Sequence, residues 1–469
     1  MIWVEELRKH LSQNSDMTFR PIIVNGSIMT LVYIAGLVED SYVQEKIIPK
    51  LFHDESFDTF EAFDKTQLDE AIEALFYGFI LVVSETSSFA YQVNGQGMQG
   101  RSIQEPSSEN TVRGPRDGFV ESISTNLSLI RRRYPSRHLQ VRISKKGTRT
   151  QTKVALIYID DIVNPELLQE VQRRLDTMDV DEVLDSGTVE QWIEDSWYSP
   201  FPQAQYTEQP ARVVAALSEG RMAIVVDGTP IVLLVPVTFS MLFQAMDDYS
   251  ERWMVGSAIR LIRFIAGFIA LMLPSLYIAL LSFHPGMVPT GLTLSIAAGR
   301  ADVPFPSIME AIMMEATLEM LREAGLRLPR FIGQTIGIVG GLVIGQSAVE
   351  AGIVSPAMVV VVALTAICSF LLPAYNAAIA IRLLRFPLMF LSGTLGLLGL
   401  ILGLMAIAAH LVSLKSFGIN YFSPFAPYHI RDWKDTAIRA PLPLLKTRPA
   451  VLQTLDGKRA NNTKRKKGW

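Results

Sequence analysis

Four glycines stand four residues apart within an uncharged stretch of this chain that runs from Phe331 to Val349: Gly333, Gly337, Gly341 and Gly345. Residues at this spacing lie on one face of a helix, although glycine in a helix interior costs about 1 kcal/mol relative to alanine. Between helices in a lipid bilayer, close contact of the two backbones drives association. The strip therefore predicts a membrane helix that packs tightly against another helix, and it is suited to packing between copies of the chain.

Charge is distributed unevenly along the 469 residues. Residues 1 to about 255 carry charged side chains throughout, residues 264–414 carry very few, and the last forty are basic. The formal net charge of −3 averages over these parts and indicates nothing about partners. The length exceeds that of one ordinary domain. We expect a two-lobed mixed α/β N-terminal soluble domain, then a polytopic α-helical transmembrane domain and a short basic tail.

The expected domain boundaries follow from the turns and the apolar runs. The first α/β lobe covers residues 1–105, the second 106–250, the transmembrane domain 251–414 and the basic C-terminal tail 415–469. Asn25-Gly26 lies between two apolar runs, which indicates a β-hairpin there and not a membrane span. Asp227-Gly228 gives the same signal in the second lobe. Helices and strands alternate in both lobes, which favours mixed α/β structure.

Four segments are uncharged and long enough to be read as membrane spans: about 264–283, 331–349, 356–374 and 388–411. The stretch 286–298 is short and contains Pro289 and Gly291, which favours a re-entrant or interfacial piece. Arg260 and Arg263 precede the first span, so the positive-inside rule places the N-terminal half in the cytoplasm. Four crossings would bring the basic tail back to the same side.

Residues 307–325 form a predicted amphipathic helix, with Glu315, Glu319 and Glu323 on one face. The helix lies at the membrane interface in one interpretation. In the other, several copies assemble and these carboxylates form a ring that gathers cations at a pore mouth. The two interpretations differ only if the protein forms oligomers.

The segment from Pro356 to Leu372 is the best candidate for a pore wall. One of its helical faces carries two hydroxyls and a valine stripe: Met358, Val361 or Val362, Thr365 and Ser369. Such a stripe can form a narrow hydrophobic gate that opens by wetting. The alternative is a packing or lipid-facing surface whose hydroxyls bond to their own backbone.

The sequence shows no catalytic constellation, and we predict neither enzyme activity nor a cofactor. It contains no Walker A pattern and no Gly-x-Ser-x-Gly elbow. Its six histidines are far apart and show no zinc spacing, so no metal is expected. The basic tail has few aromatic residues and follows a membrane domain, so membrane lipid is favoured over nucleic acid as its partner.

One segment of the second lobe combines a Gly-Pro turn with an unusual charge pattern. Arg113-Gly114-Pro115-Arg116-Asp117-Gly118 opens a predicted helix, 117–133, that ends in Arg131-Arg132-Arg133. Acidic residues at the start and arginines at the end suit the helix dipole. Three adjacent arginines exceed what the dipole needs, and they are also suited to clamping a carboxylate or binding lipid headgroups.

The stretch from Arg113 to Phe119, with Thr125-Asn126, resembles the signature of the GerA family A subunits, spore germination proteins of endospore-forming bacteria. The resemblance covers about residues 110–430. The other matching stretches are Asp247-Asp248-Tyr249, Arg260 to Phe264, Pro304-Phe305-Pro306, Leu321 to Gly325, Gly345-Gln346, Ala348 to Gly352 and Ser355-Pro356.

The resemblance implies a subunit in the inner membrane of the spore that works with a permease-like B subunit and a lipoprotein C subunit. It implies that nutrient sensing leads to cation release, and that the A subunit forms the oligomeric pore. Contact with the nutrient would fall mainly to the permease-like partner.

Other functions stay open at this stage. A paralogue resembling stage V sporulation protein AF would share the architecture and act as a germination-amplifying channel. A non-conducting membrane scaffold would only hold its partners together. A transporter in its own right would show inverted repeats or intramembrane ion pairs, and we find neither in the sequence.

Overall fold

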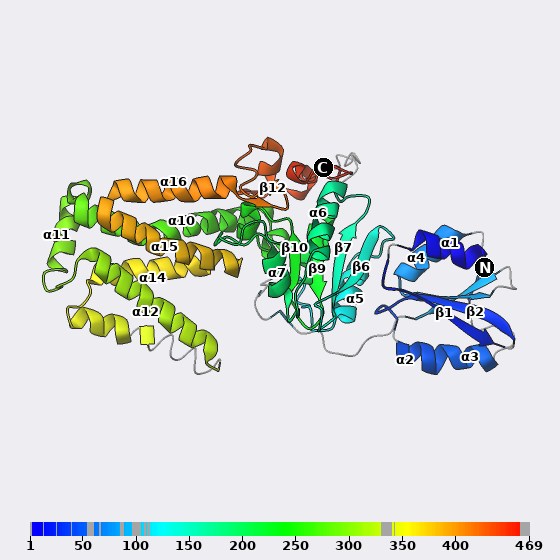
Figure 1. Cartoon of the computed structure of the whole chain (residues 1–469). Helices are drawn as coiled ribbons and strands as arrows, with labels where there is room; N and C mark the ends of the chain where they lie inside the picture. Colours follow the sequence, from blue (N-terminus) through cyan, green and yellow to red (C-terminus); the bar gives the residue numbers. More distant parts are fainter. Residues whose placement is uncertain are drawn as a thin grey trace.

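The computed structural model shows an elongated molecule with three parts in a row: two α/β lobes and a helical bundle (Figure 1). The C-terminal segment returns from the bundle to the middle part. The structure describes residues 2–12, 14–24, 26–38, 40–53, 61–64, 67–84, 89–95, 105–106, 109, 113–329, 340–341 and 343–459.

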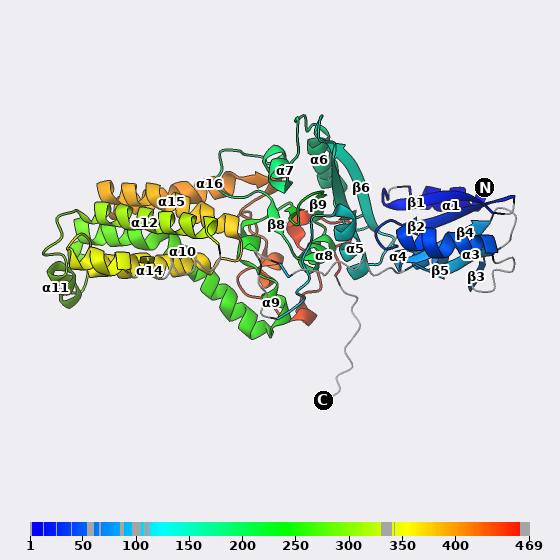
Figure 2. The same ribbon diagram turned by 90° about the horizontal axis from the view of Figure 1, so that it is seen from below.

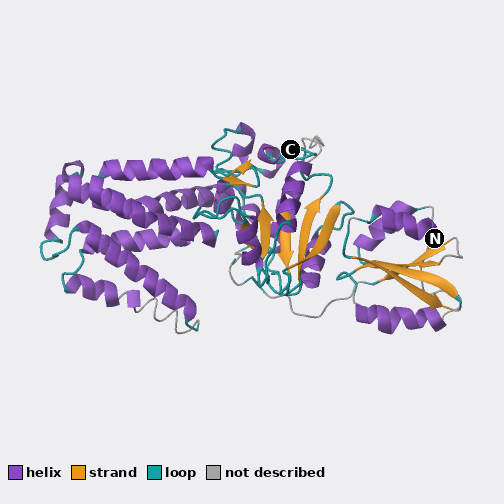
Figure 3. Ribbon diagram, viewed as in Figure 1, coloured by secondary structure: helices purple, strands orange, loops and turns teal. Residues whose placement is uncertain are grey.

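The first lobe is a five-stranded antiparallel sheet with helices on both faces (Figure 3). Its strands, in the spatial order β1-β2-β4-β5-β3, are β1 (Met17–Val24), β2 (Ser27–Ile34), β4 (Phe79–Ser84), β5 (Phe89–Asn94) and β3 (Glu61–Asp64). One face is covered by α1 (Ile2–His10) and α4 (Leu68–Phe76). The other is covered by α2 (Asp40–Tyr42), a π-helical turn (Val43–Ile47) and α3 (Ile48–His53). Successive strand residues enter opposite cores, as the strand period of two requires.

The second lobe repeats this arrangement strand for strand. Its order is β6-β7-β9-β10-β8, again antiparallel throughout. The strands are β6 (Leu139–Lys146), β7 (Thr152–Ile159), β9 (Met222–Val226), β10 (Val232–Val235) and β8 (Gln205–Thr207). One face is covered by α5 (Ile123–Arg133) and α8 (Pro210–Glu219), the other by α6 (Pro165–Asp176) and α7 (Ser186–Ile193).

Both predicted hairpins are confirmed. Val24 lies opposite Ser27 across the β1–β2 turn, and Gly26 has a φ of +77°, which glycine adopts at little cost. Gly228, between β9 and β10, has a φ of +89°. The uncharged run after Ile22 is therefore part of a sheet and does not form a membrane span.

The helix predicted from Asp117 begins instead at Ile123. The residues before it are held in place by bonds that a helix would break. The backbone N–H of Phe119 donates to the carbonyl of Glu208 at 2.8 Å. The side chain of Asn126 bonds both backbone groups of Val120, at 2.8 and 2.6 Å.

The arginines that end α5 clamp carboxylates, which was one of the two predicted roles beyond the dipole. Arg131 is buried and donates from Nε and Nη2 to the two oxygens of Asp16 in the first lobe, at 2.7 and 2.8 Å. Arg133 pairs with Asp117. The bidentate pair to Asp16 fixes the two lobes against each other, because a planar guanidinium matches a carboxylate in only one orientation.

The bundle contains five long helices among the described residues (Figure 2). They are α10 (Trp253–Phe283), α12 (Ser307–Arg327), α14 (Pro356–Phe370), α15 (Tyr375–Leu395) and α16 (Leu397–Ser413). By length and composition, α10 and α15 suffice to cross a membrane, whereas α14 and α16 are apolar but shorter, at 15 and 17 residues.

One predicted span differs from the structure, and two other predicted segments contain helices. The span 388–411 contains a helix boundary, because Gly396 has a φ of +64° and separates α15 from α16. The helix predicted over 307–325 is present as α12 and packs against α10, α14 and α15, and its place at a membrane interface stays a prediction. The stretch 286–298 holds only α11 (Thr290–Ala298), at the end of the bundle remote from the lobes (Figure 1). Of the span 331–349, residues 331–339 and 342 lie outside the described residues.

The C-terminal segment folds back onto the second lobe, and the number of membrane crossings stays a prediction. After α16, β11 (Lys415–Ser416) pairs with β12 (Ile419–Asn420), and Phe417 enters the core beneath β7 and β9. Further on, the N–H of Leu455 donates to the carbonyl of Ile162 at 3.0 Å. The run Lys464 to Lys467 lies outside the described residues.

The second lobe contains a carboxyl group whose titration should be visible in stability. Burial on α7, with Glu194 and Asp185 nearby, raises the pKa of Glu190 to about 7 from 4.5. Between these pH values the folded state keeps a proton that the unfolded state has lost, so stability falls as pH rises. Glu190→Gln should therefore be more stable than the wild type by about 1–3 kcal/mol at pH 8, with little difference near pH 4. Thermal unfolding of both chains across this range measures the difference, and a pH-independent difference would contradict the assignment.

Candidate functional site at the junction of lobe, bundle and C-terminal segment

The second lobe, the first bundle helix and the C-terminal segment meet around one buried side chain, Arg260 of α10. Its Nε donates to Oδ2 of Asp248, on α9 (Asp247–Ser250), at 3.0 Å. Its Nη1 donates to the carbonyl and the carboxylate of Asp435, both at 2.8 Å. Asp435 directly follows the 3₁₀-helix η4 (Ile430–Lys434). One guanidinium thus joins three parts of the chain.

Asp248 supplies the matching negative charge. Its side chain is 1% exposed and also accepts a hydrogen bond from Nη1 of Arg263, at 2.8 Å. Arg260 and Arg263 are three residues apart, so they lie on one face of α10. A buried carboxylate between two arginines is stable only as a set, because each charge compensates the desolvation of the others.

Tyr249 and Arg439 complete the network. The hydroxyl of Tyr249 donates to Oδ2 of Asp435 at 2.9 Å, and burial raises the pKa of Tyr249, which keeps the hydroxyl protonated. The guanidinium groups of Arg439 and Arg260 lie 5.2 and 5.5 Å from the centre of the Tyr249 ring. Arg439 also donates to the carbonyls of Asp248 and Glu251, at 2.5 and 2.9 Å.

A glycine permits the close approach of α9 and α10. A Cβ at Gly256 would lie 2.7 Å from the carbonyl oxygen of Asp248, which real Cβ atoms essentially never do. One residue further on, the hydroxyl of Ser257 donates to the carbonyl of Arg439 at 3.0 Å and accepts from its N–H at 3.1 Å. The first turn of α10 therefore packs closely against both α9 and the C-terminal segment.

The predicted family motif, residues 113–118, begins beside the same junction. The N–H of Arg113 lies 3.5 Å from a carboxylate oxygen of Asp247, and its guanidinium lies 3.7 Å from Glu251. Gly114 has a φ of +143° and approaches Ser250 closely. Arg116 forms a long, exposed contact of 3.6 Å with Glu105. The motif thus lines one side of α9.

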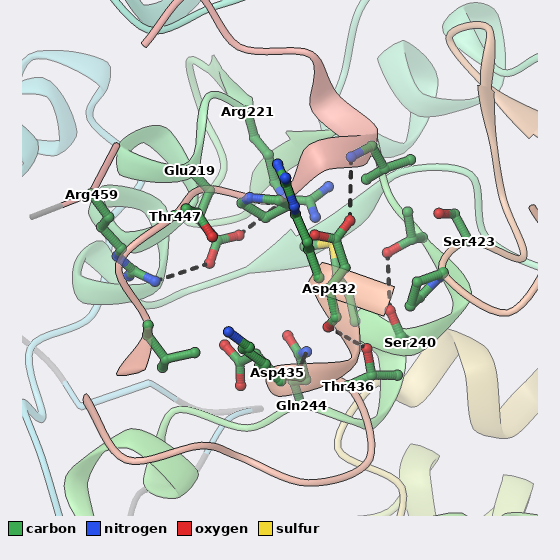
Figure 4. A pocket seen from close by; sticks show the side chains of 18 of the residues that line it. Glu219, Arg221, Ser240, Gln244, Ser423, Asp432, Asp435, Thr436, Thr447 and Arg459 are labelled. Atoms are coloured by element: carbon green, nitrogen blue, oxygen red, sulfur yellow. Dashed lines mark hydrogen bonds and ion pairs between the residues drawn. The ribbon is translucent and has the colours of Figure 1, made fainter. Parts of the chain in front are cut away.

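A polar pocket lies next to this network, between the second lobe and the C-terminal segment (Figure 4). Glu219, at the end of α8, lies 3.5 Å from Arg221 and 3.9 Å from Arg459. Burial raises the pKa of Glu219. Asp432 and Asp435 face Glu219 and Arg221 from the C-terminal segment. The pocket therefore lies at the contact between the second lobe and the C-terminal segment, which Arg260 also stabilises.

Buried ion pairs also run along α12 inside the bundle. Glu310 is fully buried and lies 2.7 Å from Arg300. Its other oxygen accepts from the N–H and the hydroxyl of Ser355, at 3.1 and 2.9 Å. Ser355 in turn caps the N-terminus of α14.

The predicted acidic stripe on α12 faces two different environments. Glu315 is buried and pairs with Arg385 of α15, which is also buried. Glu319 accepts from Arg322 at 2.8 Å and lies 3.3 Å from Arg382. Glu323 is exposed. Within one chain, Glu315 and Glu319 therefore hold α12 to α15, and a pore-mouth ring stays a prediction for an assembly.

The Glu315–Arg385 pair corrects the expectation that the apolar half contains no ion pair. The two residues are 70 positions apart, so no local pattern joins them. The available signal was the presence of Arg382 and Arg385 among apolar residues, since charges in such helices need partners. The arginine network around Asp435 was missed for the same reason.

The predicted pore-lining stripe lies inside the protomer. Met358, Val362, Thr365 and Ser369 are each at most 3% exposed, and Val361 is partly buried beside them. The hydroxyls of Thr365 and Ser369 donate to backbone carbonyls of their own helix, at 2.6 and 2.8 Å. This is the geometry of the packing alternative. A pore-lining role requires α14 to turn this face toward an axis between copies, and it stays a prediction.

The glycine strip is described in part. Gly333 and Gly337 lie outside the described residues. Gly341 is exposed with open space around it, and a Cβ at Gly345 would touch Val359 only at 3.7 Å. By contrast, a Cβ at Gly399 of α16 would overlap the carbonyl of Leu391. The α15–α16 pair thus uses glycine for contact within the chain, whereas Gly341 presents a free surface.

One histidine has carboxylate neighbours that the sequence spacing did not show. Nδ1 of His138 lies 2.8 Å from Asp160 and 4.0 Å from Asp161. Gln140 also donates to Asp160, at 3.0 Å. These contacts join the end of β7 to the start of β6, which is a sufficient structural role.

The fold and the junction define a protein that carries a two-lobed α/β module on a bundle of largely apolar helices. A family model described as Bacillus/Clostridium GerA spore germination protein matches residues 5–451. The chain belongs to this GerA family of germinant receptor A subunits, as the motifs predicted.

Relatives match along almost the whole chain. Spore germination protein GerLA of Bacillus cereus is 41% identical, over 97% of this chain and 95% of its own. Spore germination protein KA of Bacillus subtilis (strain 168) is 43% identical, over 93% and 84%. The uncharacterized membrane protein YfkQ of the same organism is 42% identical, over 95% and 90%. The crystal structure of the N-terminal domain of the A subunit of the Bacillus megaterium spore germinant receptor GerK3 is 30% identical, with a TM-score of 0.39, over 50% of this chain and 94% of that one.

Removal of the Asp248 charge should weaken the junction strongly. Asp248→Asn keeps the size of the side chain but leaves Arg260 and Arg263 buried without their shared carboxylate, a loss of about 3–5 kcal/mol. Thermal unfolding of the purified chain measures this loss. Asp247→Asn is the matched control, because Asp247 is less buried and its side chain makes a long contact of 3.5 Å with Arg113. Equal melting temperatures for the two variants would refute the central role of Asp248.

The ion pair inside the bundle should show coupling in a double-mutant cycle. Glu315→Gln and Arg385→Gln should each destabilise the chain, since each leaves one buried charge unpaired. The double variant should be more stable than the sum of the two losses implies, with a coupling of about 0.5–3 kcal/mol. Glu323→Gln, on the exposed part of the same helix, should change little. Strict additivity would show that the pair does not act as a unit.

Proposed function

We propose that this chain is the A subunit of a spore nutrient germinant receptor, and that copies of it form the ion channel that couples nutrient sensing to cation release. Membership of the GerA family carries the proposal. The geometry supports it in three respects: an apolar bundle suited to a membrane, a charged junction suited to relaying movement, and an open helix surface suited to contact between copies.

The outer faces of the bundle support placement in the inner spore membrane. Large apolar side chains project from three helices, with Phe268 63%, Val360 66% and Met405 63% exposed. Exposed apolar surface on this scale marks contact with lipid or protein. The lobes and the C-terminal segment share one end of the bundle, which we assign to the cytoplasm because Arg252 and Lys415 flank the helices there.

The junction supports coupling between the soluble module and the bundle. A movement of the second lobe displaces α9, and with it Asp248, which bonds two arginines of α10. One of these arginines, Arg260, also holds Asp435 of the C-terminal segment. Since packed charge networks have few alternative arrangements, displacement of α9 is passed on to α10.

The partners of this subunit are a permease-like B subunit and a lipoprotein C subunit, with the nutrient bound mainly by the former. In the assembly, Gly341 lies at the contact between copies, and the α14 stripe with Val361 and Val362 lines the gate after rotation toward the axis.

Three other functions predict different results. A paralogue of the stage V AF type would conduct without nutrient-binding partners. A scaffold would not conduct at all. Ion pairs within membrane helices also occur in transporters. A transporter would carry a solute across the membrane and would not pass a steady ion current.

Reconstitution in liposomes separates these functions. The chain with its B and C partners should release trapped cations when a nutrient is added. Release without partners would favour the AF-type channel. No release in any combination would favour the scaffold.

Contact between copies can be tested at Gly341. Gly341→Leu adds a side chain where no described residue lies within 4 Å, and a side chain in a contact between copies pushes the helices apart, so cross-linked oligomers should be lost. Gly325→Leu is the matched control, because Gly325 on α12 also has open space around it. Unchanged oligomers in the Gly341 variant would show that the strip is not an interface.

A further inference from the structure

An apolar cavity of about 300 Å³ lies where the bundle meets the second lobe. Helices α10 and α16 form two of its walls, through residues such as Phe268 and Ala408. The 3₁₀-helix η2 (Phe239–Phe243) and Phe422 of the C-terminal segment close the end nearest the lobe. The cavity therefore borders on the same three parts of the chain that Arg260 joins.

The walls of the cavity are apolar and suited to contact with a hydrocarbon chain. Every side chain among the described residues that line the cavity is apolar. Aromatic rings form the closed end: Phe243 stacks on Phe264 with centroids 4.3 Å apart, and Phe239 lies 5.4 Å from Phe422. Gly267 leaves room beside Phe243, which a Cβ would approach to 2.9 Å.

Water is a poor occupant of such a space. A buried water needs about 2–4 polar partners, and an engineered apolar cavity of about 150 Å³ stays dry and takes up benzene. This cavity is larger and falls within the size range of sites for small ligands, about 300–1,000 Å³. Its occupant must therefore be apolar.

We propose that one acyl chain of a membrane lipid occupies this cavity as a stoichiometric part of the junction. The cavity opens on the outer surface of the bundle, where its lining residue Phe268 is 63% exposed. A chain can enter sideways from the bilayer without leaving an apolar environment. The proposal rests on the membrane placement of the bundle proposed above, but not on the channel.

The position of the acyl chain gives it a physical effect on the protein. It fills the space between α10 and α16, and it touches Phe239 and Phe243 of the lobe and Phe422 of the C-terminal segment. An empty cavity would forfeit the contacts of all these side chains. The lipid thus adds apolar contact to a junction that a charge network and a buried apolar cluster already hold.

The test uses the full chain purified in mild detergent from its membrane. Ala408→Trp places a large side chain into the cavity, whereas Ala409→Trp puts the same side chain on the exposed surface of α16 outside it. Native mass spectrometry should show one retained lipid on the wild type and on Ala409→Trp, and its loss from Ala408→Trp. Retention of the lipid by Ala408→Trp would overturn the proposal, as would a wild type that retains none.

A second measurement locates the acyl chain directly. A phosphatidylglycerol with a photoreactive diazirine on one acyl chain is incorporated into nanodiscs together with the full-length protein. Adducts should concentrate on Gly267 to Leu271 and Leu404 to Leu411. Adducts spread over all exposed faces, including Val360 and Ile367, would leave the bundle in the membrane but refute the site. Absence of adducts anywhere on the bundle would refute the membrane placement itself.

Discussion

The carboxylate of Asp248 is the charge on which the junction of lobe, bundle and C-terminal segment depends, beside the apolar cluster that the same parts share. It is buried at the end of the second lobe, and it bonds Arg260 and Arg263 of the first bundle helix at 3.0 and 2.8 Å. Arg260 reaches on to Asp435, so the C-terminal segment is held by the same charges. A single buried charge would be prohibitively expensive, and the set is stable only because every member finds its partners. The lobe, the bundle and the C-terminal segment are therefore coupled by electrostatics that allow little freedom.

The bundle follows the same physical rule. Apolar faces can pack against lipid as well as against each other, so they specify the relative placement of helices weakly. The polar contacts of α12 supply what is missing: Glu310 bonds Ser355 at the start of α14, and Glu315 pairs with Arg385 of α15. Arg385 also donates to the carbonyl of Ala270 on α10, at 2.8 Å. Helix α12 is thus fixed to α14 and α15 by its charges. The two lobes, in turn, are joined by the pair of Arg131 and Asp16.

The sequence predicted features that depend on local patterns and missed those that depend on distant partners. The hairpins at Gly26 and Gly228 follow from the φ values that glycine permits, and the mixed α/β character follows from periodicity. The break at Gly396 was hidden, because glycine in an apolar run is read equally well as a packing residue. Whether Glu315 and the Val362 stripe point into the bundle or away from it depends on which helices surround α12 and α14. The spacing of residues along one helix does not contain that information. The identical strand order of the two lobes was likewise invisible without the pairing.

Amide hydrogen exchange in an Arg260→Lys variant tests the central claim most directly. Lysine keeps the positive charge, but its single ammonium cannot reproduce the fork that reaches Asp248 and Asp435 together. The account predicts faster exchange in three separated stretches at once: 247–251, the first turns of α10 and residues 430–439. The two sheets should exchange as in the wild type. Faster exchange confined to α10 would contradict the account, because it would show that Arg260 stabilises its own helix and does not join the three parts.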